Sequence, residues 1–288
     1  MWLRALPKHF LRLALTILLG GLLGATLVRF APGFGTDERE LDPRLSQQSI
    51  EAVRASHAGQ RNVLGYYRDY LAGLMRGDLG TSTSLDRPVA ELFGERLPAT
   101  LRSVASGVAG GWLFAFFLAL PVTSFRWRAF DVFTSGLSGL LICLPAAVVG
   151  LGMVYAGGAA SLAIGLAVFP RIFQYARNIL AQAAERPHIL AAHARGVQQA
   201  RIVAWHILPN AAPLLLAVAG ISVSMAFGAA IPIEAICDYP GIGQLTWQAA
   251  LSRDLPVLVN VTLLITVITL TANAISDVMS KAFARQPR

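Results

Sequence analysis

The sequence predicts an all-α, polytopic membrane protein with six transmembrane helices. Of its 288 residues, 55% are hydrophobic and 14% are charged, against about 25% charged residues in an average soluble domain. Long uncharged runs recur along the chain, and basic residues gather in alternate segments between them. Hydropathy and charge therefore agree on a chain that crosses a bilayer several times.

The first predicted span lies in residues 13–28 and ends near Arg29. Basic residues precede it, as they do in a secretory signal, but the residues that follow Arg29 make a poor small-residue cleavage site. We expect a retained helix. Residues 1–31 then form an N-terminal tail and transmembrane helix 1.

Residues 32–96 break the hydropathy, because they carry eight arginines and ten acidic residues. Hydrocarbon excludes such a mixture of charges, so we expect an extracytoplasmic segment here. Within it, apolar and aromatic side chains between Tyr66 and Met75 follow helical spacing. This pattern predicts an amphipathic helix, either on the membrane surface or in the core of a small subdomain.

Residues 97–288 form the predicted membrane core with spans 2–6. Span 2 covers residues 103–125 and begins beside Arg102, whose long side chain can reach the interface. The uncharged run 132–170 is about two helices long and turns at Gly157-Gly158, where two glycines permit a tight turn. Residues 211–233 and 255–275 supply the last two spans, separated by a loop that contains Glu234 and Asp254. Asn260 and Asn273 are expected within the last span, where each either lines a pathway or hydrogen-bonds between helices. Gly107 and Gly111 have the small-xxx-small spacing that lets helix backbones approach closely.

The distribution of basic residues supports six spans with both termini on the cytoplasmic side. Thirteen of the 24 Lys and Arg residues fall on the predicted inner side, whereas the short outer loops hold only Arg253. The 65-residue segment is long enough to be translocated whatever its charges. The net charge of +8 is therefore explained by topology rather than by nucleic acid as a partner.

The sequence lacks the motifs of common catalytic and metal sites. No Gly-Lys dipeptide occurs, so there is no Walker A loop, and HExxH, GxSxG and GxGxxG are also absent. Cys143 and Cys237 lie far apart, and the five histidines have no partners at metal-ligand spacing. We expect a chain that is not an enzyme and holds neither metal nor cofactor, so that any ATP hydrolysis occurs on a partner.

Residues 185–213 are too long and too rich in helix formers to be a simple connection. Three alanines between residues 191 and 194 predict a short helix with little side-chain bulk, and Gly196 predicts its end. Such a helix suits close docking into a groove of another protein. We therefore expect Gly196→Trp to block this approach.

The same segment resembles the coupling loop of ATP-binding-cassette (ABC) transporter permeases, whose pattern is EAA, three residues, glycine, nine residues and I-x-L-P. Leu190 and His206 depart from this pattern, whereas Arg195 before the glycine is typical of the peptide-transporter branch. The matching residues are Ala191, Ala192, Gly196, Leu208 and Pro209.

Further segments resemble, in the same order, the first permease subunit of dipeptide, oligopeptide and nickel importers (the DppB/OppB type). Together they cover nearly the whole chain. They are residues 29–33, 70–82, 87–89, 96–101, 240–243 and 253–257, followed by Asp277.

The resemblance implies the fold of a type I importer permease, located in a bacterial inner membrane. The chain would form half of a pathway for peptides or a similar small solute, in a heterodimer with a second permease. Two cytoplasmic ATPase subunits and an extracytoplasmic solute-binding protein would complete the importer. The ATPase would be contacted from a coupling loop, residues 178–210, through Ala191, Ala192, Arg195, Gly196, Leu208 and Pro209.

Two departures bear on transport, and two alternatives stay open. The turn at Gly157-Gly158 lacks the longer outer loop of the family, and residues 284–288 lack its Asp-Pro-Arg ending. A proton-coupled secondary carrier is disfavoured because its spans would need acidic residues, and a non-transporting scaffold would show no ATP-dependent solute movement. The residues do not distinguish peptide, nickel chelate, opine and oligosaccharide as the solute, and they indicate no substrate-binding residue.

Overall fold

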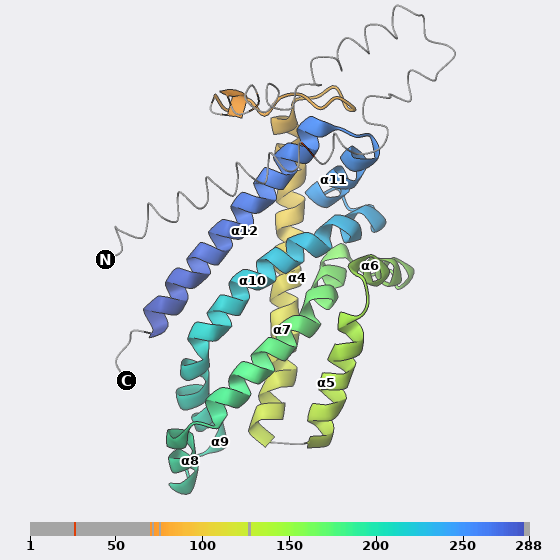
Figure 1. Ribbon diagram of the computed structural model, residues 1–288. Coiled ribbons are helices and arrows are strands. Elements are labelled where there is room, and N and C mark those ends of the chain that lie inside the picture. Colours follow the sequence, from red (N-terminus) through yellow and green to blue (C-terminus); the bar gives the residue numbers. More distant parts are fainter. Residues whose placement is uncertain (1–25, 27–69, 71, 75, 126–127, 285–288) are drawn as a thin grey trace, which may run out of the picture. The chain divides into compact units, whose positions relative to one another are not determined.

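The computed structural model describes residues 26, 70, 72–74, 76–125 and 128–284. Its described residues are mainly helical, and their β structure is one isolated bridge between Thr81 and Pro88. This confirms the all-α class. The helices are α4 (Val89–Phe125), α5 (Arg128–Ile142), α6 (Ala146–Tyr155), α7 (Ala160–Ala184), α8 (Pro187–Ala194), α9 (Gln199–Ile202), the π-helix η3 (Val203–Ile207), α10 (Leu208–Ile236), α11 (Ile242–Leu251) and α12 (Leu255–Ala284) (Figure 1).

The chain divides into two compact units. Unit 1 comprises residues 1–95 and 246–267, and unit 2 comprises residues 96–245 and 268–288. Helices α4 and α12 therefore each begin in unit 1 and continue in unit 2. The expected first span and most of the amphipathic helix near Tyr66 lie outside the described residues.

Three helical segments in the described part of the chain are long and apolar enough to cross a membrane. They are residues 89–124, 199–236 and 255–283, which contain the expected spans 2, 5 and 6. The pair α5–α6 is a fourth if it counts as one span. Helix α7 holds the expected fourth span, but its second half carries two arginines and lowers its hydropathy. The count of six spans remains a prediction.

The region expected to hold spans 3 and 4 differs from two straight helices. Helices α5 and α6 meet at a bend of 99°, because the residue before Pro145 disfavours helical backbone. Helix α6 then ends in a Schellman motif: the Gly157 N–H bonds to Val154 O and the Gly158 N–H to Met153 O. Gly157 has φ of +68°, which confirms the turn predicted at this dipeptide. Helix α7 runs through Pro170 to Ala184 rather than ending at the proline.

Helices α4 and α7 touch through their backbones. A Cβ atom built on Gly107 would lie 2.7 Å from Ser161 O, and one built on Gly165 would lie 2.9 Å from Gly107 O. A Cβ atom built on Gly111 would lie 3.2 Å from Gly165 O. The spacing of Gly107 and Gly111 therefore serves this contact, since only glycine leaves room for it.

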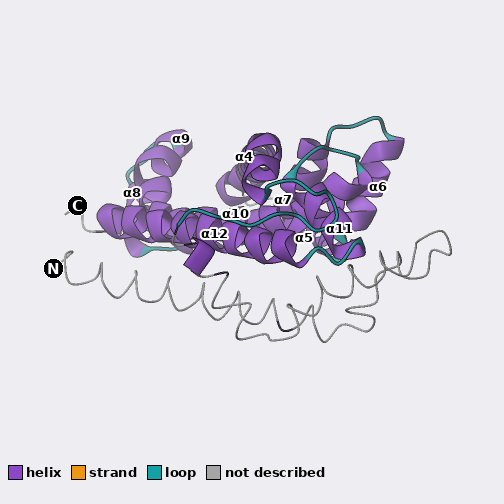
Figure 2. Ribbon diagram, turned by 90° about the horizontal axis from the view of Figure 1, so that it is seen from above, coloured by secondary structure: helices purple, strands orange, loops and turns teal. Residues whose placement is uncertain are grey.

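Helix α10 packs against α7 and against the part of α12 in unit 2, as Figures 1 and 2 show. At Gly220 an added Cβ would meet Ser276 Cβ at 2.7 Å. Ser276 donates a hydrogen bond to Leu216 O, and Ser280 donates one to Pro213 O at 2.6 Å. Asn273, expected to hydrogen-bond between helices or to line a pathway, lies 3.5 Å from the Ser224 hydroxyl. Side chains of α12 thus bond to backbone carbonyls of α10 at two levels.

Glu234 forms a buried polar junction at the end of α10. The side chain is 0% exposed, although sequence reasoning placed it in a loop. The hydroxyls of Thr100 and Ser103 each donate to it at 3.0 Å, and the Gly243 N–H donates at 2.7 Å. A Cβ on Gly243 would lie 2.6 Å from Ala230 O, so glycine is required beside the carboxylate. These bonds join α4, α10 and the start of α11.

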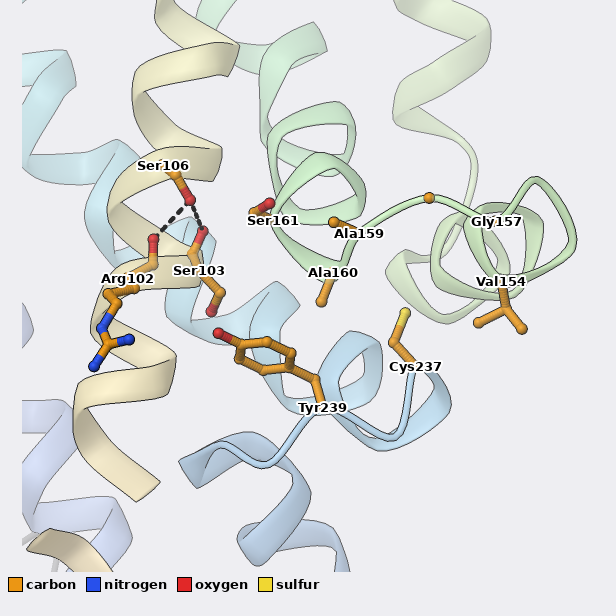
Figure 3. Close-up of a pocket in the computed structure, with 11 residues that line it drawn as sticks. Arg102, Ser103, Ser106, Val154, Gly157, Ala159, Ala160, Ser161, Cys237 and Tyr239 are labelled. Carbon is orange, nitrogen blue, oxygen red and sulfur yellow. Dashed lines mark hydrogen bonds between the residues drawn. The ribbon is translucent and has the colours of Figure 1, made fainter. Parts of the chain in front are cut away.

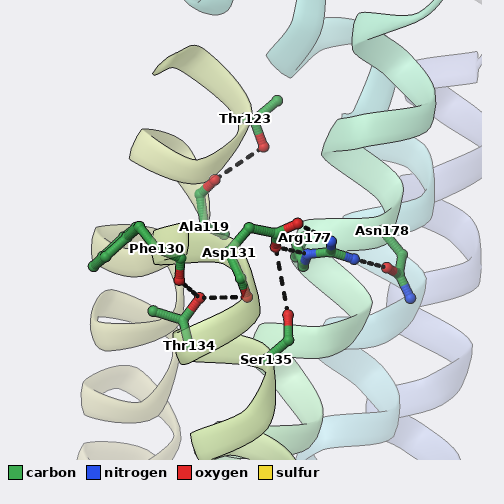
Figure 4. A network of polar contacts seen from close by, with 8 residues as sticks. All are labelled: Ala119, Thr123, Phe130, Asp131, Thr134, Ser135, Arg177 and Asn178. Atoms are coloured by element: carbon green, nitrogen blue, oxygen red, sulfur yellow. Dashed lines mark hydrogen bonds and ion pairs between the residues drawn. The ribbon is translucent and has the colours of Figure 1, made fainter. Parts of the chain in front are cut away.

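An ion pair joins α5 to α7 (Figure 4). Arg177 Nε and Nη2 donate to the two carboxylate oxygens of Asp131 at 2.6 and 2.5 Å. This is a bidentate arrangement, the stronger form of an arginine–carboxylate bond. Asp131 was expected near the end of a span and Arg177 among the basic residues of the inner side, and their pairing was not predicted.

Unit 1 is centred on a buried aspartate at the start of α12. Asp254 is 0% exposed and accepts hydrogen bonds from the Ser82 hydroxyl at 2.5 Å and from the N–H and hydroxyl of Ser84 at 2.9 and 2.7 Å. Asn260 accepts a bond from the Tyr70 hydroxyl and donates to Leu79 O, both at 2.8 Å. Asn260 therefore has the structural role that was one of its two predicted roles.

We expect Gly107→Leu to lower the free energy of unfolding by about 1–3 kcal/mol, because the new side chain must push α7 away. Gly110→Leu on the same helix is the matched control, since a Cβ there meets nothing within 4 Å. Thermal unfolding of both variants in one detergent measures the difference. Equal melting temperatures would contradict the close α4–α7 contact.

Asp254→Asn should destabilise unit 1 by about 1–3 kcal/mol at neutral pH, because it leaves hydrogen-bond donors without their carboxylate. Burial alone would raise the pKa of Asp254, but the bonds from Ser82 and Ser84 outweigh burial and hold its pKa below the usual 3.8. The carboxylate's contribution is therefore complete above pH 3.8 and is lost as the pH falls through the lower native pKa.

Unfolding monitored by hydrogen exchange of residues 76–95, at pH 7 and at pH 3, tests this dependence. The difference in free energy of unfolding between wild type and Asp254→Asn should be smaller at pH 3 than at pH 7. Asp78→Asn is the control, because Asp78 is exposed and asparagine keeps an acceptor for the Gly80 N–H. A gap that is the same at both pH values would refute a role for the ionised form.

Candidate coupling site

Helix α8 is a short helix with well-defined ends. Arg186 precedes it in extended backbone, and Pro187 occupies its first turn, a position where proline's missing N–H costs nothing. At its other end the Gly196 N–H bonds to His193 O and the Val197 N–H to Ala192 O, which is a Schellman motif. Gly196 has φ of +71°. The predicted helix and its stop at this glycine are thus both present.

The two faces of α8 differ in exposure. Ile189 and Ala192 are buried at 0% and 4% exposure, whereas Leu190, Ala191 and the last residues of the helix face outward. Arg195 is exposed at the C-cap, where its Nε donates to Ala191 O at 3.2 Å. Ala191, Arg195 and Gly196 therefore lie on the accessible surface, while Ala192 packs against the rest of the protein.

Leu208 and Pro209, the remaining residues of the predicted loop, open α10. They follow η3 directly and are partly buried. Helix α7 extends to Ala184, so that helices cover both ends of the segment 178–210 and residues 185–207 lie between α7 and α10. Helices α8 and α9 lie together beside the start of α10 (Figures 1 and 2).

A side-chain cluster missed by sequence analysis ties α8 to α10. Asn210 Oδ1 accepts a hydrogen bond from Arg186 Nη1 at 3.1 Å, and its Nδ2 lies 3.0 Å from His188 Nε2. The same Nδ2 donates to His206 O at 2.6 Å. The asparagine directly follows the Leu-Pro pair of the motif, but its partners lie 22 and 24 positions away. No local sequence pattern pairs them.

A cavity of about 370 Å³ lies beside α8. Its lining includes Leu190 and His193 of α8 together with Ser124 near the end of α4. Gln199 Nε2 donates to Ser124 O at 3.2 Å and so connects α9 with α4. The short helices are thus joined to α4 and α10, two of the long helices.

The arrangement is suited to mechanical contact rather than to chemistry. Within the described ranges, no group of three or more His, Cys, Asp or Glu residues is placed to hold a metal ion. The prominent features of the site are instead an exposed face of low bulk and a set of bonds that hold the helix to α10. A partner that moved α8 would also pull on α10.

Comparison with known proteins shows which family and which relatives the chain resembles. Residues 107–288 match the family model described as "Binding-protein-dependent transport system inner membrane component". The chain is 26% identical to the oligopeptide transport system permease protein AppB of Bacillus subtilis, covering 93% of this chain and 94% of the relative. It is also 26% identical to the glutathione transport system permease proteins GsiC of Escherichia coli O6:H1 and Pectobacterium atrosepticum, over 96% of this chain and 95% and 94% of theirs.

Gly196→Val should loosen the end of α8, because a β-branched residue at φ of +71° is strained while its Cβ meets no atom. Limited trypsin digestion at Arg195 and Arg201 reports this opening. We expect roughly tenfold faster cleavage, corresponding to about 1–2 kcal/mol. Gly196→Asn should stay near wild type, since asparagine tolerates this backbone conformation.

Gly139→Val is the control for adding the same side chain to an open glycine in α5. Equal cleavage of Gly196→Val and Gly196→Asn would show that the backbone conformation is unimportant. In that case glycine would be needed at position 196 for its small size, the property that Gly196→Trp tests, rather than for its backbone conformation.

Proposed function

Because this chain belongs to the binding-protein-dependent transport system inner membrane components, we propose that helix α8 couples ATP hydrolysis on a partner to solute movement through this chain. The chain is a multi-pass inner-membrane permease subunit of an ABC importer and is not an enzyme. Its class works with an ATPase and with a substrate-binding protein. The coupling residues are Ala191, Ala192, Arg195, Gly196, Leu208 and Pro209.

The observation that carries this proposal is that one face of α8 is exposed while the other is buried against the protein. The outward face presents Ala191 with little bulk, which allows the backbone of α8 to come close to an ATPase surface. The helix is anchored by buried Ile189 on its inward face and by the bonds of the exposed side chains of Arg186 and His188 to Asn210. A helix that is free on one side and fixed on the other transmits a displacement to α10.

Coupling requires that the two conformations of the importer differ in affinity for ATP. In the proposed cycle, the ATPases close on ATP and displace α8, and α10 and the helices packed against it then change between inward-facing and outward-facing states. Each ligand shifts the equilibrium only by its difference in affinity for the two states. Solute and ATP therefore influence each other through the same helix.

The proposed assembly pairs this chain with a second, similar permease and with two cytoplasmic ATPase subunits. Large exposed apolar side chains on α4 and α5, such as Phe117 at 70% and Leu140 at 71%, suit contact with lipid or with the second permease. The basic residues at both termini favour their cytoplasmic placement. Residues 32–96 then face outward and receive the binding protein, while residues 97–288 form the transport core.

The proposed solute is a peptide or a similar small molecule. This rests on the names of the relatives, one of which is an oligopeptide permease and two of which are glutathione permeases. Transport of the solute from the binding protein through the paired permeases would need ATP. A secondary carrier would need no ATPase, and a scaffold would move no solute.

Cross-linking tests the docking of α8. Ala191→Cys, carrying a photoactivatable maleimide, should form an adduct with the ATPase subunit in native membranes, because residue 191 is exposed. Ala192→Cys is the matched control, since this neighbour is 4% exposed. Both variants need Cys143→Ser and Cys237→Ser to remove native thiols. An adduct at least tenfold more abundant at position 191 is expected.

Absence of an ATPase adduct at position 191, in membranes where the ATPase co-purifies with this chain, would refute the docking surface. Uptake into proteoliposomes decides the wider proposal. Solute accumulation that continues without ATP would indicate a secondary carrier, and no accumulation by the assembled complex would indicate a scaffold.

A further inference from the structure

A second cavity, of about 470 Å³, lies within unit 2 and away from α8 (Figure 3). Arg102, Ser103 and Ser106 of α4 form one wall, and Ser161 in the first turn of α7 lies across from them. Tyr239, from the loop after α10, closes another side. Ligand cavities in proteins typically measure about 300–1,000 Å³, so this one has room for a small solute.

The lining carries one permanent charge, and it is positive. Arg102 is exposed, and no carboxylate of the described residues forms an ion pair with it. No acidic side chain lines the cavity. Glu234, which accepts a bond from Ser103, is fully buried and already has several donors. Asp238, between two lining residues, accepts a bond from Gln244 at 2.5 Å. The guanidinium therefore has hydrogen bonds and charge to offer a ligand.

The polar walls are held in place by hydrogen bonds within the protein. The Ser103 hydroxyl donates to Glu234 at 3.0 Å, and the Tyr239 hydroxyl donates to Ala99 O at 3.2 Å. This bond fixes the Tyr239 ring along one wall of the cavity, with its hydroxyl end toward α4 (Figure 3). The Ser161 hydroxyl adds a further donor in the first turn of α7. A site with one cation, a hydroxyl donor and an aromatic wall favours a small organic anion.

We propose that this cavity binds the carboxylate end of the transported solute, with Arg102 as its cation and Tyr239 beside its apolar part. The solute class is then a short peptide or a comparable molecule with a free carboxylate. This inference rests on the proposed function and adds a substrate-contacting residue to it. Arginine suits the task because its planar guanidinium binds both carboxylate oxygens at once.

Cys237 lines the same cavity and provides a reporter. With Cys143→Ser it is the sole thiol of this chain, which contains two cysteines. Full-length chain is prepared in phosphatidylcholine nanodiscs together with the subunits that co-purify, and labelling of Cys237 is followed by mass spectrometry. The pH is fixed and alkaline, because burial raises the pKa of this thiol. The lipid carries no net charge, so anionic headgroups do not compete for Arg102.

The first measurement compares labelling by an anionic and a cationic methanethiosulfonate of similar size. Arg102→Gln should lower the anionic-to-cationic rate ratio about tenfold, since one cation attracts the first reagent and repels the second. Arg102→Lys should keep most of the ratio. Arg171→Gln is the matched control, because Arg171 is an exposed arginine on α7 outside this cavity.

The second measurement tests binding itself with two probes, alanylalanine and its C-terminal amide. Alanylalanine should slow labelling by a neutral reagent in the Cys143→Ser background, whereas the amide should not. Arg102→Gln should abolish this protection. Labelling needs neither ATP nor an ATPase, so its outcome is independent of the test of α8 docking.

Equal protection by alanylalanine and its amide would overturn the proposal, and so would protection that survives Arg102→Gln. A rate ratio that changes with Arg102 without any protection by alanylalanine would also overturn it, because the cavity would then attract charge without binding a carboxylate. Protection that appears only in nanodiscs containing phosphatidylglycerol would likewise refute a solute site. Arg102→Lys shows whether the fold tolerates substitution here.

Discussion

The buried carboxylate of Glu234 is the constraint on which one end of unit 2 depends. A charged group without contact with water is costly unless hydrogen bonds replace its hydration. Here the replacements come from α4, through Thr100 and Ser103, and from the start of α11, through Gly243. Three helices must therefore meet at one point. The position of Tyr239, and with it one wall of the cavity at Arg102, follows from that meeting.

Helix α10 connects this junction with the coupling site. It has 29 residues, and an α-helix of that length extends about 43 Å. Asn210 near its first turn holds α8, and Glu234 near its last turn holds α4 and α11. A single continuous helix thus has the proposed ATPase contact at one end and the proposed solute cavity at the other. A displacement at α8 is carried by a rigid element rather than by a chain of weak side-chain contacts.

Hydropathy and glycine placement predicted much of this fold. The helical class, the turn at Gly157 and the end of α8 at Gly196 each follow from local residue properties, and the structure has all three. Glu234 was placed in a loop because a charged residue next to an apolar run usually ends it. Its donors lie 131 and 134 positions away, beyond the reach of any periodicity.

The segments that carry the family resemblance meet in pairs. Ser82 of one segment bonds to Asp254 of another, and Thr100 donates to Glu234 beside the Pro-Gly-Ile-Gly stretch at residues 240–243. Read separately in the sequence, these segments indicate a family, but they do not show which of them are in contact. The Asp131–Arg177 pair, the bend before Pro145 and the inward turn of Ala192 were likewise missed, because each depends on which helix faces which.

The two kinds of helix contact in unit 2 differ in how they resist displacement. Ser276 and Ser280 of α12 bond to carbonyls of α10, so an axial shift between these helices would break bonds at two levels. At Gly107 and Gly111, α4 instead meets backbone carbonyls of α7 and the side chains of Ile164 and Val168 through van der Waals contacts. Shear between packed helices proceeds by small slides of this kind. The glycines therefore let α4 and α7 approach closely through van der Waals contacts, so a small axial slide at this point would cost less than one between α10 and α12, where hydrogen bonds would break.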